Sequence, residues 1–159
     1  MDQNLLDYLQ RYGIKYLIHK HPAVFTVKES KKLIKDKSYF HTKSLFLKDE
    51  NGKFYLVCMN ANKRLDIKNL KKKLFIKELH FASSEDLNSE LNLAPGSVSI
   101  FGMIYAKPSS IILLVDKEVW GAETTGFHPN INTATLEISH ENLEKFCNSL
   151  KCKKEIIAL

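Results

Sequence analysis

Three polar segments of this chain hold residue types that could act on a phosphate or an ester. The first is centred on Lys43, which shares one face of a predicted strand with Leu45 and Leu47, because successive side chains of a strand point to opposite faces. A lysine at the edge of an apolar pocket supplies a point charge for a phosphate or a developing oxyanion. The alternative is a lysine whose stem packs on leucine while its ammonium reaches water. The spacing alone leaves both interpretations open.

The other two segments are loops that expose backbone or an imidazole beside apolar strands. In "PGSVSIFG", residues 95 to 102, Gly96 and Gly102 allow close backbone approach, so that N–H groups could hold an oxyanion. In "GFHPNINTAT", residues 126 to 135, His128 could bind a polar ligand atom or transfer a proton. An ordinary loop and a structural histidine are the competing interpretations.

Several other kinds of chemistry lack their usual patterns. His19 and His21 would face the same way on a strand, but no third metal ligand follows at a recognisable spacing. Nucleotide-binding loops of the types GxGxxG and GxxxxGK[ST] are absent, and so is the GxSxG pattern of serine hydrolases. Cys58, Cys147 and Cys152 form no CxxC pattern and are odd in number, which indicates ordinary thiols in a reducing compartment. We therefore expect no metal and no cofactor.

Length and hydropathy bound the class of protein. The chain has 159 residues, 44% of them hydrophobic and 26% charged, which is typical of one domain spanning residues 1 to 159. It has no apolar run of membrane-spanning length, and "MDQNLLDYLQ" at its start lacks the features of a signal peptide. We expect a cytoplasmic protein with no membrane partner.

The positive charge is concentrated in the first half of the chain. Residues 1 to 80 carry 18 Lys/Arg against 8 Asp/Glu, whereas residues 81 to 159 carry 6 against 10. The densest cluster is "KRLDIKNLKKKLFIK" at 63 to 77, and "KESKKLIKDK" at 28 to 37 forms a second one. Such clusters favour a polyanionic partner, although a solvated helix face explains the same pattern.

Capping residues, apolar periodicity and turn signals predict a mixed α/β fold. Helices are predicted over 2–12, Thr26–Ile34, Asp66–Leu74, Ser83 or Ser84 to Leu91, and Ser139–Leu150. Strands are predicted over 16–19, 43–48, 53–59, 100–106, 111–115, 133–138 and 156–157. Asn51-Gly52 marks a hairpin, residues 54–59 are apolar on both faces as in a central strand, and 121–126 is predicted to be a loop. The fold class is therefore α/β, one domain with a central mixed sheet flanked by helices.

Six segments in fixed order carry a resemblance to a known family. They are "HPAVFTVKES" at 21–30, "HTKSLFLKDENGKFYLV" at 41–57, "RLDIKNL" at 64–70, "FASSEDL" at 81–87, "PGSVSIFG" at 95–102 and "FHPNINTAT" at 127–135. Together they resemble the YbaK-type aminoacyl-tRNA deacylase family, related to the editing domain of bacterial prolyl-tRNA synthetases. The free-standing branch that hydrolyses alanyl-tRNA(Pro) is the most similar.

The resemblance implies a set of site residues. Lys43 stands where the family has its essential lysine, Gly96 matches the glycine of its GxxxP-type loop, and His128 matches the histidine of its substrate pocket. Substrate contacts are implied for Thr42, Ser44, Ser97, Val98, Ile100, Phe101, Gly102, Asn132 and Thr133. The basic helix becomes a candidate contact to the acceptor stem through Lys63, Arg64, Lys68, Lys71 and Lys72. Two departures bear on pocket size: Ser44 replaces the usual Asn, and Ile100 replaces the loop proline.

The implied activity is hydrolysis of the aminoacyl ester of alanyl-tRNA(Pro), with prolyl-tRNA(Pro) excluded by size. An ester is already activated, so the protein needs to hold it, admit water and stabilise the oxyanion, and in this family a ribose hydroxyl of the substrate is able to assist. The implied partners are the acceptor end of tRNA(Pro) and, as a further candidate, prolyl-tRNA synthetase; DNA is not expected. Editing of another residue such as Cys or Ser, a non-catalytic tRNA- or synthetase-binding module, and a small-molecule-binding regulator stay open as alternatives.

Overall fold

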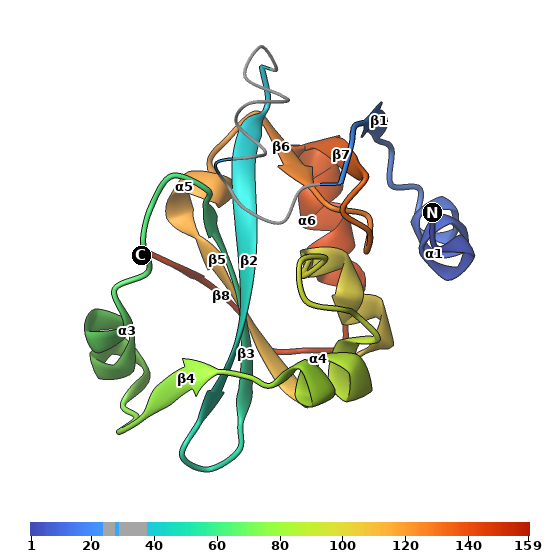
Figure 1. Cartoon of the computed structure of the whole chain (residues 1–159). Coiled ribbons are helices and arrows are strands. Elements are labelled where there is room, and N and C mark those ends of the chain that lie inside the picture. The colour runs from blue at the N-terminus through green and yellow to red at the C-terminus, as the bar shows by residue number, and fades with distance from the viewer. Residues whose placement is uncertain (24–27, 29–37) are drawn as a thin grey trace.

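A mixed sheet of eight strands forms the centre of the protein (Figure 1). The computed structural model describes residues 1–23, 28 and 38–159. The strands are β1 (Leu17–Lys20), β2 (Phe40–Asp49), β3 (Phe54–Asn60), β4 (Leu79–Phe81), β5 (Ile111–Asp116), β6 (Thr124–Phe127), β7 (Ala134–Ser139) and β8 (Lys154–Ile157). Their order is β1-β7-β6-β2-β3-β5-β8, and β4 pairs separately with β2. The pairings β2–β6, β3–β5 and β5–β8 are parallel and the others antiparallel, which confirms the predicted mixed sheet.

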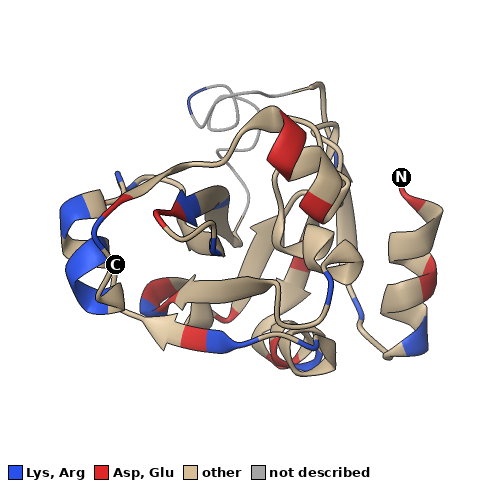
Figure 2. Cartoon of the chain, turned by 90° about the horizontal axis from the view of Figure 1, so that it is seen from below, with Lys and Arg blue, Asp and Glu red and all other residues tan. Residues whose placement is uncertain are grey.

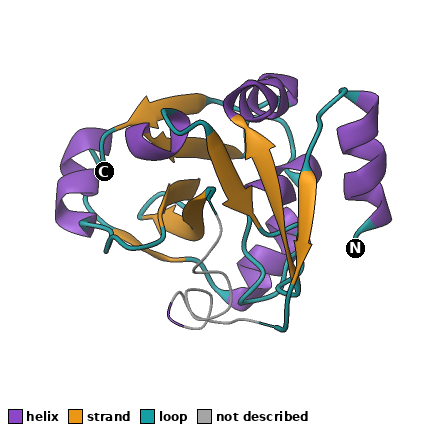
Figure 3. Cartoon of the chain, turned by 90° about the horizontal axis from the view of Figure 1, so that it is seen from above, coloured by secondary structure: helices purple, strands orange, loops and turns teal. Residues whose placement is uncertain are grey.

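Helices cover both faces of this sheet, but unequally (Figure 3). They are α1 (Gln3–Arg11), α3 (Ile67–Leu74), α4 (Ser84–Leu91), the 3-10 helix η1 (Ile100–Tyr105), α5 (Lys117–Trp120) and α6 (His140–Ser149). In Figure 1, α3 lies on one side of β2 and β3, and α4 and α6 lie on the other. The large core therefore lies on the α4 and α6 side, and α3 covers a smaller one.

The hairpin of β2 and β3 separates these two cores. Phe46 and Cys58 belong to the larger core, whereas Leu47 and Val57 belong to the smaller one. Each fully buried side chain of this size stabilises the fold by about 1.5–3 kcal/mol. Because β3 is buried on both faces, its prediction as a central strand is confirmed.

Three helices begin at the predicted capping residues. The side chains of Asp66, Ser83 and Ser139 accept the backbone N–H three residues further on, at 3.0, 3.0 and 3.2 Å. A cap of this kind contributes about 1 kcal/mol by satisfying a backbone donor that the helix leaves unpaired. These local signals are strong enough to place the start of each helix from sequence.

One edge of β2 is left without a strand partner along its middle. β2 pairs with β6 at its first two residues and with β4 at its last three, and no strand among the described residues fills the interval. The His41 carbonyl accepts the Ala61 N–H on the β3 side (3.0 Å), while the Phe46 carbonyl accepts the Ala82 N–H on the opposite edge (2.9 Å). Backbone groups alternate along a strand, so the N–H and C=O of Ser44 point into the gap.

Two predicted elements have a different conformation. The strand predicted over 100–106 is wrong, because this segment is the 3-10 helix η1. Ser99 caps it by accepting the Phe101 N–H at 3.2 Å. Ile100 to Met103 are all buried, so the apolar residues showed no period that could distinguish a helix from a strand. The loop predicted over 121–126 is also partly wrong, since its second half is strand β6.

Some elements had no sequence signal, and one prediction stays untested. β4 and α5 have three and four residues, too short to show a period. The helix predicted from Thr26 to Ile34 lies outside the described residues, as does the 28–37 basic cluster apart from Lys28.

Candidate functional site

Lys43 is a half-buried cation on the smaller-core face of β2. It lies opposite Met59 of β3, and its ammonium donates a hydrogen bond to the backbone carbonyl of Lys63. Burial lowers the pKa of Lys43 below its ordinary value. Within the described part of the chain no carboxylate pairs with this ammonium. The structure thus presents a partly desolvated charge that an anion could neutralise.

Ser44, the next residue, faces the other side of the sheet and lines a small pocket. The pocket has a volume of about 230 Å³. Its lining comes from the middle of β2, from β4 and the start of α4, and from the loop before η1: Ser44, Leu45, Phe46, Phe81, Ala82, Ser83, Ser84, Leu87, Pro95, Gly96 and Val98. Of the residues predicted for the site, Ser44, Gly96 and Val98 therefore come together here. Lys43 and His128 are not part of this lining.

Gly96 lies in a tight turn at the rim of this pocket, which we call the Ser44 pocket. The Ser97 N–H donates to the Ala94 carbonyl at 3.1 Å, with Pro95 second and Gly96 third at φ +87°, as in a type II turn. A side chain is strained at this φ, so the turn itself requires glycine. The N–H of Gly96 has no acceptor within the described residues and is available to a ligand.

His128 follows β6 and is held as a neutral imidazole. Its Nδ1 lies 3.1 Å from the carbonyl of Ala134, and since a carbonyl only accepts, Nδ1 carries the proton and donates it. Burial, together with the neighbouring His21, lowers the pKa of His128. Its Nε2 is therefore an acceptor, which suits the ammonium or hydroxyl of a substrate.

Three residues that were expected to contact substrate are packed inside the protein. Ile100 and Phe101 are completely buried in the larger core. A Cβ on Gly102 would lie 2.6 Å from the Leu93 side chain, so glycine allows η1 to pack closely there. These three residues line neither the Ser44 pocket nor a larger cavity at the beginning of β2, which is described below.

The remaining predicted substrate residues are Thr42, Ser97, Asn132 and Thr133, which come from separate segments. Thr42 donates its hydroxyl to the Gly126 carbonyl at 2.6 Å and so ties β2 to β6. Asn132 is half-buried, and Thr133 is exposed, with its carbonyl accepting the His21 N–H at 3.0 Å. Ser97 is half-buried beside the pocket turn. None of these four residues lines the Ser44 pocket.

The basic helix is confirmed as an amphipathic surface element. Leu70 is buried beneath it, and Figure 2 shows basic segments gathered on this helix near the C-terminal end. Arg64, Lys68 and Lys72 are exposed and have no ion-pair partner within residues 38–159 or the described N-terminal part. Lys63 differs, because its ammonium pairs with Glu118 and lies 3.9 Å from Asp116. Its charge is therefore largely compensated.

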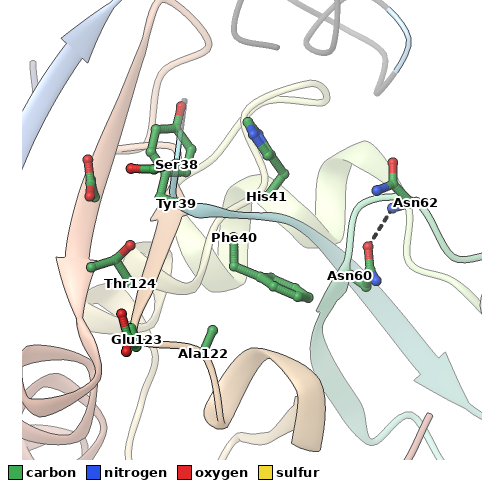
Figure 4. Close-up of a pocket in the computed structure, with 10 residues that line it drawn as sticks. Ser38, Tyr39, Phe40, His41, Asn60, Asn62, Ala122, Glu123 and Thr124 are labelled. Carbon is green, nitrogen blue, oxygen red and sulfur yellow. Dashed lines mark hydrogen bonds between the residues drawn. The ribbon is translucent and has the colours of Figure 1, made fainter. Parts of the chain in front are cut away.

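A second, larger cavity lies at the beginning of β2 (Figure 4). Its volume is about 570 Å³, and its lining comprises Ser38, Tyr39, Phe40, His41, Asn60, Asn62, Ala122, Glu123, Thr124 and Glu137. In Figure 4, Asn60 and Asn62 lie on one side of Phe40 and Glu123 and Thr124 on the other, and the Asn62 N–H donates to Asn60 Oδ1 at 2.8 Å. The sequence prediction missed this cavity, because its residues come from separate segments and form no motif. Its carboxylates disfavour phosphate.

Two negative findings apply to the described residues. No group of three or more His, Cys, Asp or Glu side chains is arranged to hold a metal ion there. Within the same residues, every helix is too short or too polar to cross a bilayer.

Sequence comparisons agree on one family over most of the chain. The family model described as an aminoacyl-tRNA editing domain matches residues 21–146. The prolyl-tRNA editing protein ProX of Acetoanaerobium sticklandii is 33% identical over 90% of this chain and 88% of its own length. The prolyl-tRNA synthetase associated domain-containing protein 1 of Danio rerio is 30% identical over 91% of this chain and 79% of its own.

Solved structures show the same fold at lower identity. A candidate trans-editing enzyme for prolyl tRNA synthetase superimposes with a TM-score of 0.74 and 16% identity, covering 100% of this chain and 99% of that chain. A hypothetical protein, APE2540, has a TM-score of 0.75 and 20% identity, covering 95% and 98%. These matches confirm the architecture of the sheet and its flanking helices.

Proposed function

Because the chain belongs to the aminoacyl-tRNA editing domain family, we propose that this aminoacyl-tRNA deacylase removes alanine from alanyl-tRNA(Pro) and spares prolyl-tRNA(Pro). The observation that carries the proposal is the Ser44 pocket, whose volume of about 230 Å³ is below the range of ordinary small-molecule sites and holds an aminoacyl group. The choice of alanine follows the resemblance to the alanine-editing branch, in which a larger ring is excluded by steric overlap with the pocket walls. A relative named as a prolyl-tRNA editing protein supports tRNA(Pro) as the carrier.

The chemistry requires binding and charge stabilisation more than a nucleophile. Water attacks the ester carbonyl, the carbonyl oxygen becomes negative, and the ribose oxygen leaves with a proton. Ser44 and Gly96 both line the pocket, and their N–H groups have no acceptor within the described residues, so they are suited to hold that oxygen. A ribose hydroxyl of the substrate can relay the proton, so the site needs no serine nucleophile.

Lys43 and His128 act on the rest of the substrate. Lys43 faces the opposite side of the sheet from the pocket, so its charge is better placed for a phosphate of the terminal nucleotide than for the ester carbonyl. His128 accepts a hydrogen bond through Nε2 and helps to fix the amino acid. Both roles are positioning and electrostatic, which is sufficient for an activated ester.

The basic helix contributes the contact with the acceptor stem. Exposed Lys68 and Lys72 on this helix, and Arg64 just before it, bind phosphates, and Lys71 lies one turn from Lys68 on the same helix. We leave Lys63 out of this contact, because its ammonium is already paired with Glu118. A relative named as prolyl-tRNA synthetase associated supports docking to that synthetase as a further partner.

The deciding experiment compares hydrolysis of alanyl-tRNA(Pro) and prolyl-tRNA(Pro) by the wild type and by Lys43→Ala. We expect loss of alanine alone, and a reduction of about 100-fold in kcat/KM in Lys43→Ala, the size typical of a substrate that is misplaced by about 1 Å at the reacting centre. Lys53→Ala is the matched control, since the Lys53 ammonium also donates to a backbone carbonyl, that of Ser109, at the far end of the hairpin.

Two outcomes would contradict the proposal. If neither ester is cleaved faster than in buffer, alanine editing is wrong. A panel of tRNAs charged with cysteine or serine then separates altered specificity from a module that binds without catalysis. If Lys43→Ala keeps the wild-type rate, the role given to Lys43 is wrong.

A further inference from the structure

Phe75 is the most exposed large apolar side chain within the described residues. Its side chain is 96% exposed, compared with 63% for Leu17 and 60% for Phe81. A ring this exposed buries almost no surface and adds nothing to the core. A packing role therefore does not explain a phenylalanine here.

The backbone at this position does not favour phenylalanine either. Phe75 follows the last turn of α3 in the left-handed conformation, at φ 57° and ψ 41°. The N–H of Phe75 donates to the Lys72 carbonyl (3.3 Å) and that of Ile76 to the Lys71 carbonyl (3.1 Å), the two bonds of a Schellman motif. Glycine is the usual residue at this point, because a side chain clashes in the left-handed region. The protein thus keeps a strained, exposed aromatic where glycine would be favoured.

Phe75 has lysines on both sides of it in the sequence and lies on a segment whose backbone is held at both ends. Lys71, Lys72 and Lys73 form the last turn of α3, and Lys77 lies two residues after Phe75. The carboxylate of Glu50, in the β2–β3 turn, accepts the N–H groups of Lys77 (3.0 Å) and Glu78 (3.1 Å). Both ends of the segment that carries Phe75 are therefore fixed, and its backbone does not need to be ordered when a ligand binds.

We propose that Phe75 is a stacking platform for an unpaired base of the RNA, with the neighbouring lysines binding its phosphates. Exposed aromatic rings among cations are the combination that single-stranded nucleic acid uses, since every base has a π-face. The chain continues from Phe75 through β4 to Phe81, which lines the Ser44 pocket. Six residues span at most about 20 Å, so one short unpaired 3′ end can reach both places. This inference rests on the proposed function, because it assigns the RNA to that same enzyme.

A protein partner is the less favoured occupant of this surface. The fully buried part of protein interfaces is depleted in lysine, whereas Phe75 stands directly beside a lysine-rich turn. The charge of this helix complements phosphate and not an apolar protein patch.

The test is the affinity of Phe75→Gly for two RNA hairpins, one with a single-stranded 3′ tail and one with a blunt end. We expect binding of the tailed hairpin to weaken about tenfold and binding of the blunt hairpin to stay unchanged. The salt dependence should keep its slope, since no charge is removed. The melting temperature should not fall, because glycine relieves the left-handed backbone. Phe75→Trp should retain tailed-hairpin affinity.

Asn92→Gly is the control, since Asn92 also follows a helix in the left-handed conformation (φ 55°) but ends α4. It should leave both affinities unchanged. Equal binding of the tailed hairpin by wild type and Phe75→Gly overturns the stacking role, and if that variant loses binding to a prolyl-tRNA synthetase instead, the surface is a protein contact. Equal weakening for both hairpins overturns the unpaired base as its target. A wild type that binds neither hairpin overturns the proposed function together with this inference.

Discussion

The two faces of the β2–β3 hairpin differ in depth, charge and exposure. The face bearing Ser44 is covered by the larger core and holds a small pocket, whereas the face bearing Lys43 has the smaller core and the basic helix α3. Adjacent residues of one strand thus point into two environments, because side chains alternate. Under the proposed function, the pocket face acts on the ester and the basic face holds the RNA.

The two faces also differ in how firmly their helices are anchored. The pocket face is supported by fully buried aromatic residues, among them Phe101 and Phe146, whose rings meet edge to face at a centroid distance of 5.1 Å. On the other face, Leu70 is the one residue of α3 that is fully buried. We infer that the pocket face is rigid and that the face covered by α3 rests on a thinner layer.

Gly96→Ala should have the largest effect on hydrolysis after Lys43→Ala, and it should change only the pocket face. A Cβ at φ +87° forces the turn to change and displaces the N–H groups at the pocket. We expect deacylation of alanyl-tRNA(Pro) to fall about 100-fold with tRNA affinity unchanged. Single-turnover hydrolysis and equilibrium binding measure the two quantities.

Gly52→Ala is the matched control for the backbone strain. Gly52 has φ +78° in the hairpin turn, far from the pocket along β2. It should lose similar stability but keep its rate of hydrolysis. A Gly96→Ala enzyme with the wild-type rate, or with weaker tRNA binding and normal chemistry, would contradict the division between the faces.

The double variant Lys68→Ala/Lys72→Ala should have the opposite pattern. Loss of two phosphate contacts lowers tRNA affinity by roughly tenfold at low salt and reduces the slope of log K against log salt by about 1.5. The rate of hydrolysis with bound substrate should be unchanged. Titrations at several salt concentrations measure the slope.

Lys107→Ala/Lys151→Ala provides the same change of charge away from α3. Both lysines are exposed and have no ion-pair partner within the described residues. The control should bind tRNA as the wild type does. If both double variants lose the same affinity, the net charge of the protein and not the α3 surface determines binding.

The smallest effect expected is in the pH dependence. Burial lowers the pKa of His128 below its ordinary value of 6.5, and the neutral ring is the form that accepts a hydrogen bond. Hydrolysis measured as kcat/KM should therefore hold down to pH 6.5 and fall several-fold as the pH drops through the lowered pKa. In His128→Gln this acid limb should disappear. An acid limb centred above pH 6.5 would assign the titration to another group.

Sequence was a reliable guide wherever the physical cause was local. Asp66, Ser83 and Ser139 cap helices through their own side chains, and Asn51-Gly52 turns the hairpin without help from the rest of the chain. The face shared by Lys43 with Leu45 also followed from strand alternation alone. These interactions act over a few residues, so the order of residue types is sufficient to predict them.

Sequence was a poor guide where packing decided the conformation. The segment from Ile100 to Tyr105 is apolar throughout and became a 3-10 helix because Ser99 caps it and Gly102 lets it pack against Leu93. The composition of such a run fits a strand equally well. The exposure of Phe75 could not be predicted from the sequence either, since an aromatic residue after an amphipathic helix is normally expected to be buried.

The sequence by itself determined the α/β class, the family and the chemical types available at the site: a lysine, a glycine turn, a histidine and a basic helix. The tertiary structure alone decided that Ser44 and Gly96 share a pocket while Lys43 faces away, and that the middle of β2 lacks a strand partner within the described residues. The reason is physical. Residue types set local hydrogen bonds and hydrophobicity, whereas the pairing of distant strands sets which side chains and backbone groups meet.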